Sequence, residues 1–146
     1  MGWVDIAEMP PPILGGIRYN THRMRIAISG YFLLYPATGT GQYSANLIRE
    51  LARLCPDELL VICPRETTGL ARSLLTVEQG NTKVVPLSLP VGGDLGKLWF
   101  EQIGLPWVCR SRQVELLHVL YLGPPLAKPC RTVLTIHDLI MLLFPE

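Results

Sequence analysis

Short apolar runs alternate with amphipathic stretches along most of this chain. Runs rich in aliphatic and β-branched residues predict five strands, which cover residues 25–29, 58–63, 83–87, 114–119 and 131–136. Stretches with apolar residues three or four positions apart predict helices, which cover residues 42–54, 66–75 and 97–112. Strands that alternate with helices are typical of an α/β fold, here a doubly wound, Rossmann-like parallel sheet with right-handed crossovers.

The predicted helices carry further expectations. The sheet-facing stripe of the first helix is expected to consist of Tyr43, Leu47, Leu51 and Leu54, with Ile48 beside it. Gly104 and Pro106 interrupt the helix over 97–112, so we expect a kink or a break there. The three glycines of residues 91–96 predict a mobile segment. Packing in the core or on the domain surface, rather than sugar binding, is the favoured role of the aromatic residues Trp99, Phe100 and Trp107.

The first 23 residues do not share this pattern. A proline run at 10–12 and a glycine pair at 15–16 oppose regular structure, and no hydrophobic period is present. The segment also lacks the charged start and apolar stretch of a secretory signal. We predict a disordered leader over residues 1–23, with a natural start at Met24, and a folded unit over residues 24–146.

Composition narrows the classes of function. The chain has 146 residues, which predicts one domain, and its formal net charge of +1 excludes a broad basic surface for nucleic acid. Its four cysteines are not at zinc-ligand spacing, so we expect reduced thiols and no metal. The apolar segment over 139–144 is much shorter than the about 20 residues that span a membrane. These features predict a cytoplasmic protein without a transmembrane segment, for which peripheral contact with the inner face of the membrane stays open.

The loop before the first predicted helix is a candidate phosphate site. It holds Gly39, Thr40 and Gly41, and backbone N–H groups at a helix start can bind an anion. The loop is no dinucleotide fingerprint, because Ser44 occupies the third glycine position, and no Walker motif, because Gly-Lys-Ser/Thr does not occur. A plain turn is the alternative interpretation.

Two histidines lie at the ends of predicted strands. His118 ends the fourth, and a satisfied structural histidine is the favoured interpretation there. His137 and Asp138 follow the fifth strand, where they either contact a sugar or form a turn in which Asp138 caps the next segment. Ligands bind beyond the carboxyl ends of parallel strands, so we expect both histidines and the glycine loop to converge. His118 and Asp138 are candidates for contact with the acceptor or the sugar.

Three blocks of this sequence resemble family 4 glycosyltransferases, which have the two-domain GT-B fold. Residues 24–51 resemble the family's opening strand, glycine-bearing loop and Tyr-x-x-x-Leu helix. Residues 98–110 resemble its Trp-Glu-Gln-Leu-x-Leu-Pro helix, with Phe100 inserted between Trp99 and Glu101. Residues 135–146 resemble its Thr-Ile-His-Asp-Leu-Ile-Pro-Leu-x-Phe-Pro-Glu segment, with Met141 in place of a proline.

The resemblance implies retaining transfer of a hexose from a nucleotide-sugar to a glycan or lipid-linked acceptor, without a metal or further cofactor. It implies that this first domain holds mainly the acceptor. Gly39, Thr40 and Gly41 would then approach the donor phosphates, and His137 would be the catalytic histidine near the transferred sugar. The family's second domain, which carries the nucleotide pocket and a motif of two glutamates, has no counterpart in these residues.

The resemblance therefore predicts the truncated amino-terminal part of a GT-B enzyme, inactive alone, whose carboxy-terminal donor-binding domain is absent. Its predicted partners are the nucleotide-sugar, the acceptor and that missing domain, without nucleic acid. Two alternatives stay open: a non-catalytic binding module and a fragment that needs a partner. In either case the strand over 131–136 is expected to lack a neighbour on its far side.

Overall fold

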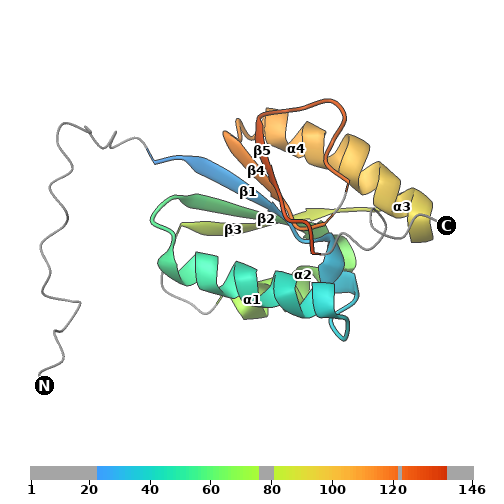
Figure 1. Cartoon of the computed structure of the whole chain (residues 1–146), viewed down its shortest axis with the longest axis horizontal. Coiled ribbons are helices and arrows are strands. Elements are labelled where there is room, and N and C mark those ends of the chain that lie inside the picture. Colours follow the sequence, from blue (N-terminus) through green and yellow to red (C-terminus); the bar gives the residue numbers. More distant parts are fainter. Residues whose placement is uncertain (1–22, 76–80, 122, 138–146) are drawn as a thin grey trace, which may run out of the picture.

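Five parallel strands form one sheet in the order β3-β2-β1-β4-β5 (Figure 1). The computed structural model describes residues 23–75, 81–121 and 123–137. The strands are β1 (Arg25–Ser29), β2 (Glu58–Pro64), β3 (Thr82–Leu87), β4 (Leu116–Val119) and β5 (Arg131–Leu134). The order confirms the predicted parallel α/β sheet and is compatible with a Rossmann-like fold. Because the chain crosses back after β3, the order reverses between β1 and β4, which is where such sheets bind ligands.

Helices cover both faces of the sheet. In Figure 1, α1 (Gly39–Leu54) and α2 (Thr68–Leu74) lie on one side, and α3 (Gly93–Trp99) and α4 (Leu105–Ser111) lie on the other. Successive residues of a strand point to opposite faces, so Ala27 belongs to the core under α4 and Ile28 to the core under α1. Short helical turns follow β1 and β2, namely η2 (Tyr31–Leu34) and η3 (Arg65–Thr67).

The buried stripe of α1 agrees in part with the predicted one, because Ile48 is fully buried and Leu47 and Leu51 pack against the core. The helix begins at Gly39, three residues before the predicted start, and its buried residues are Gly41, Ser44 and Ile48. Tyr43 and Leu54, which were expected to face the sheet, are 37% and 65% exposed. Small residues at the contact let the helix lie close to the chain beneath it. The buried Ser44 hydroxyl is satisfied because it donates to the Thr40 carbonyl at 2.7 Å.

The predicted helix over 97–112 has no break, but an irregular helical turn lies where a kink or a break was expected. The helix starts inside the glycine stretch that was expected to be mobile, and a π-helical turn, η4 (Phe100–Gly104), joins α3 to α4. The Leu105 N–H donates to the Phe100 carbonyl across this wider turn. Pro106 then stands at the start of α4. Of the aromatic residues expected to pack in the core or on the domain surface, Phe100 is fully buried and Trp107 lies at the surface, 65% exposed.

Two regions of the sequence-based predictions lie outside the described residues. Residues 1–22 of the predicted leader over 1–23 are one, and the segment from Asp138 to Glu146 is the other. Within the described part, β5 stands at the edge of the sheet with β4 as its neighbour. Val133 and Ile136, at and just beyond this strand, are 46% and 50% exposed. The edge position agrees with the sequence-based expectation for this strand.

Candidate functional site

The first turn of α1 lies at the carboxyl edge of the sheet. Thr38 caps the helix: its hydroxyl accepts the Gly41 N–H at 3.1 Å and donates to the Tyr35 carbonyl at 2.8 Å. Gly39 and Thr40 are the first two residues of the helix, whose N–H groups have no partner within a helix. These two residues therefore supply the amides that a phosphate could take at the positive end of the helix dipole.

The two glycines of this turn meet different surroundings. A side-chain carbon at Gly41 would lie 2.0 Å from the Tyr35 carbonyl oxygen, a separation that no real side chain tolerates. At Gly39 such a carbon would meet nothing within 4 Å. Gly41 thus lets α1 pack against the loop after β1, whereas no such contact requires the glycine at position 39.

His137 lies beside this helix although it follows β5. Its Nε2 is 2.9 Å from the Leu120 carbonyl oxygen, and a carbonyl only accepts, so Nε2 carries the hydrogen. In the neutral ring, Nδ1 is therefore the acceptor. The ring packs edge-on against Tyr43 of α1, with centroids 4.7 Å apart, and lies 6.1 Å from the ring of Tyr121. The histidine thus joins the ends of β4 and β5 to α1.

The His118 ring has a hydrogen-bond partner within the protein, just beyond β5. It belongs to β4, and its Nε2 lies 2.9 Å from the hydroxyl oxygen of Thr135. Burial lowers its pKa, because the charged ring loses hydration. A hydrogen bond of this kind satisfies the ring and favours the structural interpretation over contact with a ligand. Asp138 lies outside the described residues.

The lowered pKa of His118 predicts a pH-dependent stability. The unfolded chain binds this proton near the ordinary value of 6.5, above the folded value, so the stability contributed by the neutral ring is present above pH 6.5. It is lost as the pH falls through the folded pKa. The free energy of unfolding, measured by denaturant titration at several pH values, should therefore fall less steeply below pH 6.5 in His118→Gln than in the wild type. Glu101, whose raised pKa gives the opposite slope, is present in both proteins, so their difference isolates His118. Parallel curves for the two proteins would contradict the expectation.

A buried ion pair between Lys97 and Glu101 was not predicted from the sequence. The side chain of Glu101 is only 7% exposed, and its Oε1 lies 2.9 Å from Nζ of Lys97, one helical turn earlier. Burial raises the pKa of Glu101, while the hydrogen bond and charge of Lys97 oppose the rise. Lys97 Nζ also lies 5.7 Å from the ring centroid of Tyr121. The only available signal in the sequence was the i, i+4 spacing of opposite charges within an otherwise apolar stretch.

A cavity opens over the carboxyl ends of β1, β2 and β3. Its volume is about 350 Å³, and its lining includes two tyrosines, one carboxylate and a glycine-containing backbone segment: Tyr31, Tyr35, Glu66 and residues 91–93. Tyr31 is 3% exposed, and burial together with a hydrogen bond to Tyr35 raises its pKa to about 12. Tyr31 therefore keeps its proton near pH 7, and both tyrosine hydroxyl groups can donate and accept hydrogen bonds. The apolar residues Leu34, Leu89 and Pro90 complete the lining, so the cavity offers a ligand both hydrogen bonds and apolar contact.

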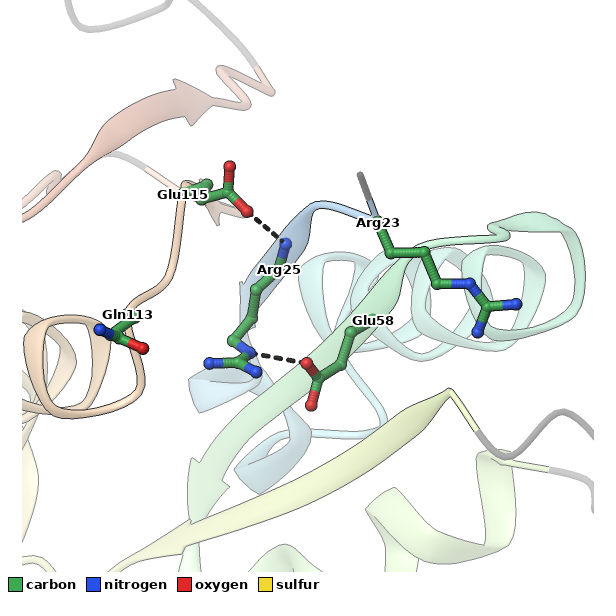
Figure 2. A pocket seen from close by; sticks show the side chains of 5 residues that line it. All are labelled: Arg23, Arg25, Glu58, Gln113 and Glu115. Atoms are coloured by element: carbon green, nitrogen blue, oxygen red, sulfur yellow. Dashed lines mark hydrogen bonds and ion pairs between the residues drawn. The ribbon is translucent and has the colours of Figure 1, made fainter. Parts of the chain in front are cut away.

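A second cavity lies at the opposite edge of the sheet, where the strands begin (Figure 2). Its charged residues make contacts that stabilise the fold. Arg25 Nε donates to Glu58 Oε2 at 2.6 Å, and Lys83 Nζ donates to Glu58 Oε1 at 2.8 Å. The Arg25 backbone N–H donates to Glu115 Oε1 at 3.1 Å. Hydrogen bonds from Lys83 and Arg25 lower the pKa of Glu58. These contacts tie the starts of β1, β2 and β3 together, and they lie far from both histidines in the fold.

Three further observations bound the chemistry. Among residues 23–75, 81–121 and 123–137, no group of three or more His, Cys, Asp or Glu side chains could hold a metal ion. No helix in the same part of the chain is long and apolar enough to cross a membrane. The four cysteines are free, and Cys63 and Cys109 are buried.

Comparison with known proteins adds no relative. Neither the protein-family models nor the curated proteins nor the solved structures contain a match to this chain.

Proposed function

We propose that this chain is the acceptor-side part of a retaining glycosyltransferase, which moves a hexose from a nucleotide-sugar to a glycan or lipid-linked acceptor. One observation supports the proposal most: His137 packs on Tyr43 of α1, which brings it close to the amide-bearing first turn of the same helix. The backbone amides of the first turn can bind a phosphate group, and His137 can form a hydrogen bond with the sugar ring attached to it. Both lie near the reversal point of the sheet, between β1 and β4.

Each part has a chemical task in this proposal. The Gly39 and Thr40 amides stabilise the negative charge that grows on the departing diphosphate, without proton transfer. His137 accepts a hydrogen bond from a sugar hydroxyl at Nδ1, while its Nε2–H still donates to the Leu120 carbonyl. The cavity lined by Tyr31, Tyr35 and Glu66 takes the acceptor. The nucleotide itself would be held by a GT-B donor domain, as the sequence resemblance implies.

Nucleoside diphosphate binding tests the proposal directly. Amide NMR shifts of the full chain are followed during titration with UDP, GDP and their sugar conjugates. Gly39 and Thr40 should move with a common saturation curve, while Gly69, near the start of α2, serves as the internal control. Absence of any movement at Gly39 at millimolar nucleotide would refute the phosphate role. Transfer of radiolabelled sugar, assayed with the chain joined to a donor domain, then separates an enzyme from the non-catalytic binding module that is the alternative.

A further inference from the structure

Tyr121 lies at the meeting point of three parts of the candidate site. It follows β4, and its ring centroid is 5.0 Å from the ring of Phe32 in η2 and 6.1 Å from the ring of His137. In addition, Nζ of Lys97 in α3 lies 5.7 Å from the same centroid. The position of this one ring is therefore linked to both the loop after β1 and the candidate catalytic histidine.

The cation beside Tyr121 is held by a carboxylate that is nearly out of solvent. Lys97 Nζ is 2.9 Å from Glu101 Oε1 and 3.2 Å from Oε2, so it touches both oxygens. The Lys97 side chain is 27% exposed and that of Glu101 is 7% exposed. Removing one member would leave the other charge partly buried without its partner, which is far more costly than losing an exposed pair.

The same carboxylate supports the backbone just after Tyr121. Gly123 has a φ of +133°, a region that residues with side chains rarely adopt, and a side-chain carbon there would lie 2.7 Å from Glu101 Oε2. Only a glycine lets the backbone approach the carboxylate so closely. Glu101 thus lies close to the loop after β4 at two points, near Tyr121 through Lys97 and near Gly123 through the close approach of the backbone.

We propose that Glu101 is a positioning residue of this site, which sets the orientation of His137 through Lys97 and Tyr121. The carboxylate holds the ammonium against one side of the tyrosine ring, and the ring in turn packs near the imidazole. The inference rests on the proposed function only for the task of His137; the chain of contacts from Glu101 to His137 stands without it. An ion pair that merely stabilised α3 would leave the imidazole unaffected when it was replaced.

The imidazole NMR signals of His137 in the ligand-free, full-length chain give the test. These signals are assigned by comparison with His137→Gln and are sensitive to the rings of Tyr43 and Tyr121, which lie 4.7 Å and 6.1 Å away. Glu101→Gln keeps the shape of the side chain but removes its charge, so the His137 signals should move toward those of a free histidine. Glu50→Gln, which breaks the exposed pair with Arg53, is the matched control and should leave them unchanged.

Two further variants keep the test decisive if Glu101→Gln does not fold. Lys97→Met combined with Glu101→Met replaces both charges by apolar groups, an exchange that is often neutral or stabilising. This folded variant should also show displaced His137 signals, because the cation beside Tyr121 is gone. Lys97→Arg, which retains the charge, should keep them near the wild-type position. Unchanged His137 signals in the double variant would overturn the proposal. The measurement needs no nucleotide, so its failure is distinct from failure of the proposed function.

Discussion

Gly41→Ala is expected to lower the free energy of unfolding by about 3 kcal/mol or more, the upper end of what overpacking costs. The added methyl group would stand 2.0 Å from the Tyr35 carbonyl oxygen and 3.1 Å from that of Phe32. Both contacts are to backbone, which cannot rotate away as a side chain can. The helix would have to move off the loop, and its buried residues Ser44 and Ile48 would lose their packing. Denaturant unfolding followed by circular dichroism measures the effect.

Gly39→Ala is the matched control, because it is the same substitution two residues earlier. Nothing lies within 4 Å of the added carbon, and alanine has a better helix propensity than glycine. Its free energy of unfolding should therefore equal or slightly exceed that of the wild type. Equal destabilisation by both substitutions would contradict the assignment of Gly41 to close packing. Because Gly39→Ala is expected to keep the fold, it is also the better variant for asking whether the turn binds phosphate.

His137→Ala should lower the rate of sugar transfer by about a hundredfold, equivalent to about 2.7 kcal/mol of transition-state stabilisation. The expectation rests on the proposed function and applies to the chain joined to a donor domain. His137 is exposed, and only one of its nitrogens is taken by Leu120. The loss should therefore fall on turnover, with a thermal midpoint close to that of the wild type.

His118→Gln is the comparison for this second prediction. His118 is on the neighbouring strand, but its ring is partly buried and bonded to Thr135. Its substitution should change stability and leave turnover within a few fold. Full transfer activity in His137→Ala together with a lower thermal midpoint would show that His137 is a structural turn residue. Equal losses of turnover in both variants would show that turnover depends on the integrity of the carboxyl edge of the sheet and not on the His137 ring in particular.

The sequence predicted the sheet well because its strands are encoded locally. The run from Ile26 to Ser29 is apolar enough to need cover on both faces, and the structure places β1 between β2 and β4. Histidines at the ends of β4 and β5 were placed at one edge because parallel strands share a direction. The contacts of each histidine were not predictable, since Leu120 and Thr135 are each 17 residues from the histidine they bond.

The face of a helix that becomes buried proved less predictable. In α1 the predicted residues Leu47, Ile48 and Leu51 do pack in the core. The large residues at the two ends of the predicted stripe, Tyr43 and Leu54, are exposed instead, and the small residues Gly41 and Ser44 are buried. Hydrophobic spacing records which side chains prefer to leave water, and it says nothing of how near the helix axis comes to the chain beneath it. When the approach is close, small residues must occupy the contact and larger ones move to its margins.

The sequence by itself thus determined the class of fold, the order of its elements and the edge of the sheet at which the candidate site residues lie. The tertiary structure decided which groups meet there. It placed His137 against α1, took the Gly41 amide into a helix cap, and buried Glu101 beneath the loop that carries Tyr121. The physical reason is the separation in sequence of the residues that interact. Strand and helix patterns depend on neighbours within a few residues. The burial of a charge and the contacts of a ring depend on distant segments, which only the folded chain brings together.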